Sequence, residues 1–176
     1  SCCQAMAMPD SSWRTSQPAR KIDVRAFNRV LDIDSAAGIV DVEGMTSYGT
    51  LAVAVLAKGL LPGAVPQLKA ITIGGAVSGL GIEASSFKYG LVHDTVEELE
   101  VLLPDGDIVV CTPTNEHSDL FFGFPNSYGT LGYTLRVKAR AFPAKKYVAL
   151  THIRHRDPQA FFQDLADRCA RPVDFV

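Results

Sequence analysis

The residues with the clearest chemical potential lie between Ile71 and Asp94, in the run ITIGGAVSGLGIEASSFKYGLVHD. Glycine loses more conformational freedom on folding than any other residue, so a stretch this rich in glycine requires a reason. One reason is a backbone that approaches a ligand closely, because successive free N–H groups form a concave nest for phosphate oxygens. Short serine hydroxyls add donors without bulk. The run therefore predicts a site for a phosphate-bearing cofactor, with a tightly packed glycine-rich loop as the alternative.

Two common nucleotide sites do not fit this run. Residues 79–84 read GLGIEA and match the loose form of the dinucleotide fingerprint. That fingerprint requires a strand, a tight turn and a long helix in succession. Residues 85–90, SSFKYG, have no apolar stripe and predict a poor helix. The chain also lacks the pattern GxxxxGK followed by Ser or Thr. We therefore exclude a Rossmann site and a P-loop.

The sequence predicts several strands around the glycine-rich run, and most of them are paired as hairpins. Residues 30–34 and 38–43 predict two short strands joined by a turn. Residues 96–103 and 107–111 flank Pro104-Asp105-Gly106, and Asp-Gly is a typical hairpin turn. Residues 131–142 alternate in polarity and predict a strand with one buried face, on which we place Leu131, Tyr133, Leu135, Val137 and Ala139. Residues 146–153 are a further candidate strand.

Helices are predicted between these strands. Thr46 is the expected cap of a helix over residues 47–58, and a short helix is expected over 116–122. Residues 157–169 predict an amphipathic helix. Helices inserted among hairpins indicate an α+β domain rather than alternating βαβ units.

Composition excludes several functions. The chain has 176 residues, a net charge of −2 and a pI near 6.0, so it is not expected to bind nucleic acid. Its longest apolar run, residues 51–57, is far too short for a transmembrane segment.

The four cysteines show no CxxC pair and no metal-ligand spacing. We therefore expect no metal and a reduced, cytoplasmic setting. No signal peptide is visible. Because the chain begins with Ser1 rather than Met, we expect a fragment or a chain with an altered start.

Three blocks, in matching order and spacing, closely resemble delta-24 sterol reductases and their bacterial relatives. The first block is residues 71–90, and the second joins DLFF at 119–122 to SYGTLG at 127–132. The third is FPAKKYV at 142–148. The chain thus resembles, over about Val24 to Leu150, the vanillyl-alcohol-oxidase-like flavoproteins with a PCMH-type FAD domain.

This resemblance implies the second subdomain of a PCMH-type FAD-binding domain, an antiparallel sheet flanked by helices. In that fold FAD lies between two α+β subdomains. The resemblance assigns no catalytic residue and no covalent flavin link. It implies that backbone amides and hydroxyls along two segments line the FAD, namely Thr72, Gly74, Gly75, Ser78, Gly79, Gly81, Ile82, Glu83, Ala84, Ser85, Ser86, Tyr89 and Gly90, and then Gly129, Thr130 and Leu131.

The same resemblance implies a division of the chain. We expect a poorly ordered arm over residues 1–21 and an FAD-binding PCMH-type domain over 22–150, with its first subdomain largely missing. Residues 151–176 would begin the substrate or cap region that follows.

The activity that the resemblance implies is reduction of a carbon–carbon double bond, of the sterol delta-24 type. FAD would carry the electrons, NADPH or NADH would supply them, and a sterol or lipid would be the substrate. One alternative is an FAD-linked oxidase or dehydrogenase of another branch, acting on a 2-hydroxy acid or an ether-lipid precursor. Another is a catalytically incomplete FAD-domain fragment.

Several other residues have two interpretations. Glu83 could bind a ribose hydroxyl or cap a turn, and Cys111 is expected to be a small core residue. His93 and Asp94 are adjacent, and neighbours in a strand point to opposite faces. We therefore do not expect them to form a proton-handling pair.

Overall fold

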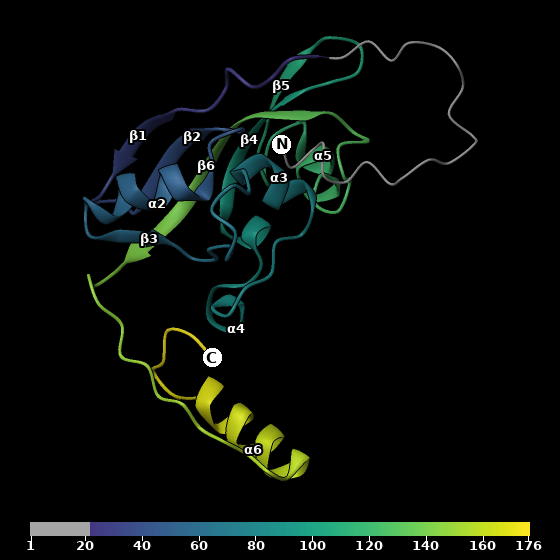
Figure 1. Ribbon diagram of the computed structural model, residues 1–176. Coiled ribbons are helices and arrows are strands. Elements are labelled where there is room, and N and C mark those ends of the chain that lie inside the picture. The colour runs from purple at the N-terminus through teal and green to yellow at the C-terminus, as the bar shows by residue number, and fades with distance from the viewer. Residues whose placement is uncertain (1–21) are drawn as a thin grey trace.

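The computed structural model describes residues 22–176. Its centre is an antiparallel sheet in the order β1-β2-β6-β4-β5 (Figure 1). The strands are β1 (Val30–Asp34), β2 (Ile39–Glu43), β4 (Val96–Leu102), β5 (Ile108–Cys111) and β6 (Tyr133–Pro143). A short strand, β3 (Leu60–Pro62), pairs with the far end of β6. The α+β class and both predicted hairpins are confirmed.

Strand β6 organises the sheet because it pairs with β2, β4 and β3. Its inner face buries Leu135, Val137 and Ala139. On the other face Arg136 joins the carboxylates of Asp41 at 2.9 Å and Glu98 at 2.6 Å. Alternating apolar and charged residues thus give one face to the core and the other to cross-strand ion pairs.

The predicted inner face of β6 is wrong at its start. Leu131 and Tyr133 are exposed, and Thr134 is buried in their place. The pairing of β4 with β6 shifts register between Glu100 and Val101. A bulge reverses the side-chain alternation beyond it, which a strict period of two cannot foresee.

Helices α2 (Tyr48–Leu56), α3 (Ile73–Ser78) and α5 (Ser118–Gly123) share one hydrophobic core with the sheet. The cap of α2 is Ser47, whose hydroxyl accepts from the Thr50 N–H. The prediction that Thr46 caps this helix is wrong, because its hydroxyl donates to the Arg29 carbonyl. The largest fully buried side chains in this core are Phe124, Leu51, Ile73, Leu99, Val40, Val42, Val55, Val77, Val101 and Val137.

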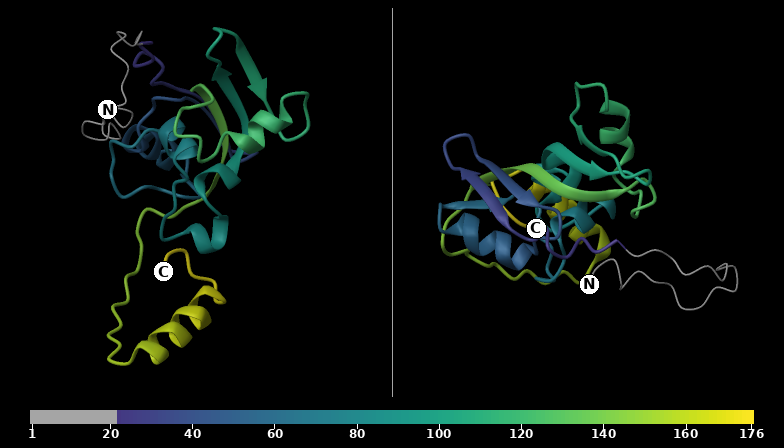
Figure 2. Two further views of the ribbon diagram at one scale, coloured as in Figure 1. Left: turned by 90° about the vertical axis from the view of Figure 1, so that its right-hand side faces the viewer. Right: turned by 90° about the horizontal axis from the view of Figure 1, so that it is seen from above.

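The C-terminal residues form an arm that projects from this body (Figures 1 and 2). The strand predicted over residues 146–153 is wrong, because the segment forms no strand. Helix α6 (Pro158–Cys169) is confirmed, with Asp157 as its cap. The arm returns to the body at its end, where the Val176 N–H donates to the Ala84 carbonyl at 3.1 Å. Lys88 and Asp174 form an ion pair of 2.9 Å at the same place.

Within residues 22–176, none of the helices has the length and apolar character needed to cross a bilayer.

Candidate functional site

The glycine-rich run folds into helices joined by a bend. After α3, the chain turns at Leu80 and forms α4 (Ser86–Tyr89), a single turn. A 3-10 helix, η1 (Val92–Thr95), then leads into β4. The sequence did not predict α3, because two adjacent glycines disfavour a helix. The cap at Thr72 explains it: the Thr72 hydroxyl accepts from the Gly75 N–H at 3.2 Å.

Gly74 is required by packing rather than by a ligand. A Cβ atom there would lie 2.8 Å from the Gly44 carbonyl oxygen and 3.0 Å from the Thr134 Cβ. The Gly74 N–H also donates to that Gly44 carbonyl at 2.8 Å. The alternative interpretation of the run, close packing of backbone, therefore holds at this position.

The bend itself is the C-terminal cap of α3. Gly79 has φ −105° and ψ 9°, and Leu80 follows with φ 55°. The N–H groups on either side of Leu80, those of Gly79 and Gly81, donate back to the Gly75 and Ala76 carbonyls at 2.9 and 2.8 Å and close the helix end. Among the described residues, no hydrogen-bond acceptor lies on the backbone N–H of Leu80, Ile82 or Ala84. The bend thus offers amides that are available to an acceptor.

A second loop with left-handed residues, over 126–129, contacts the bend that follows α3. Asn126, Tyr128 and Gly129 have φ values of 63°, 50° and 80°. The Tyr128 N–H donates to the Ser78 carbonyl at 3.1 Å, at the end of α3. A Cβ on Gly79 would lie 4.0 Å from the Tyr128 ring. The fold therefore brings the two predicted cofactor-binding segments together.

The joined segments present apolar side chains to solvent. Ile82 is 70% exposed, Tyr128 is 57% exposed and Leu131 is 40% exposed. Gly129 and Thr130 are exposed as well. Apolar surface beside free amides is the usual composition of a ligand-binding surface. We call the exposed surface of residues 78–84 and 127–131 the nest surface.

Several of the other predicted residues pack or hydrogen-bond within the fold. The Ser85 hydroxyl is buried and donates to the Gly63 carbonyl, and the Ser86 hydroxyl accepts from the Glu83 N–H. Tyr89 stacks on Phe142 with 4.2 Å between ring centroids. Gly90 has φ 81°, and a Cβ there would lie 2.6 Å from an Asp94 carboxylate oxygen. These side chains shape the bend, and only their backbones remain for a ligand.

Tyr48 lies beside the bend, and it belongs to none of the sequence motifs described above. It lies in the first turn of α2, is 2% exposed, and its N–H donates to the Ile71 carbonyl at 2.9 Å. Burial, with a smaller contribution from the negative charge of Glu83, raises the pKa of the Tyr48 phenol well above its usual range. The phenol is therefore neutral at every physiological pH.

His93 and Asp94 differ from expectation. They lie in η1 rather than in a strand, and His93 Nε2 lies 3.6 Å from Asp94 Oδ1. The turn brings neighbours together that a strand would separate. The strand expected here is therefore wrong, although the two side chains remain beyond hydrogen-bond length.

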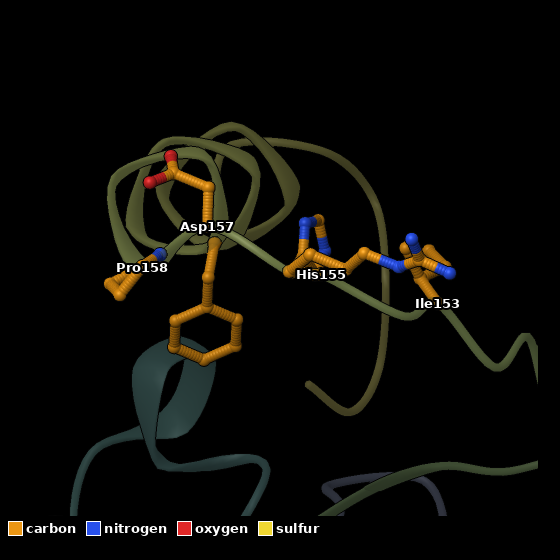
Figure 3. A pocket seen from close by; sticks show the side chains of 6 residues that line it. Ile153, His155, Asp157 and Pro158 are labelled. Atoms are coloured by element: carbon orange, nitrogen blue, oxygen red, sulfur yellow. The ribbon is translucent and has the colours of Figure 1, made fainter.

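Two hollows lie outside the nest surface. One, of about 270 Å³, is formed by the arm itself, between Ile153, His155, Asp157 and Pro158 (Figure 3). The other, of about 350 Å³, includes Val77, His93 and Phe121 among its lining residues. Neither is lined by residues 78–90.

Comparison with known families gives the class of the chain. A family described as FAD binding domain matches residues 13–112, which is more than half of the sequence. The chain belongs to this FAD-binding domain family. The match covers the bend and the hairpin of β4 and β5, and β6 follows it.

Relatives of this FAD-binding domain include enzymes named delta(24)-sterol reductase. The pea protein is 39% identical over 75% of this chain, and the human protein is 41% identical over 69% of it. Each match covers 23% of the relative. A rice protein named cytokinin dehydrogenase 7 is 31% identical over 81% of this chain and 28% of its own length. The chain thus spans about a quarter of the relatives it matches.

FAD is the cofactor that this family implies, and the nest surface fits it. Unpaired amides near Leu80 and Ile82 suit phosphate or carbonyl oxygens. The exposed ring of Tyr128 and the side chain of Leu131 suit the apolar faces of a ring system. The fit rests on backbone groups more than on side chains, which agrees with the glycine content of the run.

Proposed function

We propose that this chain forms the FAD-binding part of an oxidoreductase of the delta-24 sterol reductase type. The observation that carries the proposal is the hydrogen bond from the Tyr128 N–H to the Ser78 carbonyl. It joins two left-handed turns, far apart in sequence, into one surface with free amides. The names of the pea and human relatives support the choice of reaction.

The predicted residues have different roles in binding FAD. Free amides of Leu80, Ile82 and Ala84 bind the anionic oxygens of FAD, and Ile82, Tyr128 and Leu131 cover apolar ring surface. Gly129 and Thr130 keep the backbone accessible at the second turn, whereas Gly79 and Gly81 close the end of α3, Gly81 against Val92. Thr72, Gly74, Gly75, Ser78, Glu83, Ser85, Ser86, Tyr89 and Gly90 complete the binding segment by holding its shape. When bound, FAD supplies the hydride chemistry that a carbon–carbon double bond requires.

The proposed domain division follows the sheet. Residues 22–150 make up the FAD-binding unit, because β1 through β6 form one sheet with one core. Residues 151–176, with α6, begin the substrate region. The arm proposed for residues 1–21 lies outside the described residues.

The electron donor and substrate are proposed from the same reaction class. NADPH or NADH reduces the cofactor, and a sterol or a similar lipid accepts the electrons. We propose an intracellular setting, supported by Cys111 and Cys169, which are free cysteines.

A second candidate is an FAD-linked dehydrogenase of another branch, favoured by the rice relative. It shares the FAD surface and differs in the acceptor of electrons. An oxidase or dehydrogenase acting on 2-hydroxy acids or ether-lipid precursors falls in the same class.

The deciding experiment is a titration of the purified chain with FAD, followed by flavin fluorescence and thermal unfolding. A ligand that binds only the native state must raise the unfolding temperature. Binding and stabilisation support the proposal. If neither this chain nor a longer protein that contains it binds FAD, the domain is an empty scaffold.

With FAD bound, anaerobic addition of NADPH and then of a sterol with a side-chain double bond tests the longer protein's reaction.

A further inference from the structure

The hollow of about 350 Å³ beside α3 has the composition of a small-molecule site. Its floor is made by Val96 and Leu99 of β4, and Phe121 and Phe122 of α5 form a wall. Seven of its nine lining residues are apolar, and the other two are His93 and Asp94. Ligand sites are typically apolar hollows of this size with a few polar groups. We call this hollow the α5 cleft.

The size of the α5 cleft limits its ligand. An apolar cavity of about 150 Å³ holds one benzene, so a space of about 350 Å³ holds roughly 14 non-hydrogen atoms at similar packing. That is enough for two fused aromatic rings with a substituent, and too small for a sterol. The edge-to-face pair of Phe121 and Phe122, with centroids 5.4 Å apart, offers aromatic surface to such rings.

His93 supplies a polar group that the fold leaves unused. Its Nδ1 is buried without a hydrogen-bond partner among residues 22–176 and does not face the cleft. Its Nε2 lies 3.6 Å from the Asp94 carboxylate, beyond hydrogen-bond length. Nε2 is therefore the ring nitrogen left to a ligand in the cleft, where it can pair with a hydroxyl group. The carboxylate of Asp94 beside it disfavours an anionic ligand and favours a neutral one with a hydroxyl group.

We infer that the α5 cleft binds a neutral, two-ring aromatic molecule that carries one hydroxyl group, held by Phe121 and Phe122 and oriented by His93. The site is separate from the nest surface, since no residue from 78 to 90 lines it. Val77 lines the cleft and the next residue, Ser78, receives the hydrogen bond from Tyr128. The two sites are therefore neighbours across α3.

The probe is 2-naphthol, with naphthalene as the analogue that lacks the hydroxyl. Each is titrated into the isotope-labelled chain and followed by NMR of the Val77, Val96 and Leu99 methyl groups and the His93 ring. We expect 2-naphthol to bind with a Kd on the order of 0.1 mM. Naphthalene should bind about fivefold more weakly, which is the range of one hydrogen bond.

Three variants separate the contributions. His93→Leu should remove the preference for 2-naphthol and leave naphthalene binding unchanged, whereas the matched His117→Leu, outside the cleft lining, should change neither. Val96→Phe should fill the floor and weaken both probes at least tenfold. Because Val96 is a core residue, Phe122→Ala provides a second test: Phe122 is 67% exposed, and its loss should weaken both probes severalfold in a chain that still folds.

The titration is repeated with saturating FAD. Unchanged 2-naphthol binding supports a separate site, and it does so whether or not FAD itself binds. Displacement of 2-naphthol by FAD at the cleft residues would overturn the proposal while supporting the FAD assignment. Shifts confined to Ile82, Tyr128 and Leu131, or no shifts at all, would also overturn it.

Discussion

The backbone N–H of Tyr128 donates to the carbonyl oxygen of Ser78 over 3.1 Å. Leu80, two residues after Ser78, has φ 55°, and Tyr128 itself has φ 50°. Such conformations are unfavourable for residues with a side chain and persist only where the surroundings hold them. The contact between these turns is therefore a specified feature of the fold, and the predictions below begin with it.

Leu80→Gly should stabilise the fold. The left-handed conformation of Leu80 costs about 1 kcal/mol, and glycine at this position after a helix avoids that cost. We expect the free energy of unfolding to rise by about 0.5–1 kcal/mol in urea denaturation. Leu56→Gly, a change of the same type at the last residue of α2, should lower it instead. A loss of stability in Leu80→Gly would show that the leucine side chain outweighs the strain.

Gly74→Ala should destabilise the fold by about 1–3 kcal/mol, because the added Cβ would lie 2.8 Å from the Gly44 oxygen. Gly123→Ala is the matched control, since a Cβ in that α5 position meets nothing within 4 Å. It should stabilise the chain by about 0.5–1 kcal/mol. Thermal unfolding compares the two. Equal effects would mean that α3 does not lie against the Gly44 turn.

Ile82→Asp should weaken FAD binding at least tenfold. It places a negative charge beside the free amides of the bend, where FAD oxygens are proposed to bind. Because Ile82 is 70% exposed, folding should be unaffected. Ile108→Asp, at a position 58% exposed on β5, is the control and should bind FAD normally. Flavin fluorescence measures both affinities, and equal affinities would remove the nest surface from the cofactor site.

Acid should weaken the fold through Glu43. The Arg29 guanidinium holds the pKa of the buried Glu43 carboxyl below its usual range by a hydrogen bond of 2.8 Å. A carboxyl with a lowered folded-state pKa stabilises the fold above its unfolded pKa. That contribution should be lost as the pH falls from about 4.5 through the folded-state pKa.

The measurement is the unfolding temperature against pH, with Glu43→Gln as the test. Glu43→Gln should reduce the slope of this curve below about pH 4.5. Glu97→Gln, at an exposed position that forms no ion pair within residues 22–176, should retain the slope. Identical slopes in both variants would exclude Glu43 as the acid-sensitive group.

Local patterns in the sequence determined most of the sheet and its class. Alternating polarity located β6, short strand-forming runs located β1 and β2, and the Asp-Gly turn located the hairpin of β4 and β5. Helix α6 followed from its amphipathic pattern. These features depend on residues close in sequence, so local reading can find them. The density of glycine and serine in residues 71–90 likewise indicated where the backbone would be exposed or closely packed.

Only the tertiary structure decided at which residues of this run the backbone is exposed and at which it is closely packed. Gly74 faces the Gly44 backbone and Gly90 faces Asp94, whereas the amides of Leu80 and Ile82 remain free. The bulge in β6 and the approach of Tyr128 to Ser78 depend on partners distant in sequence. Spacing along a chain fixes which residues are neighbours on one element, and it carries no information on which element packs across from them.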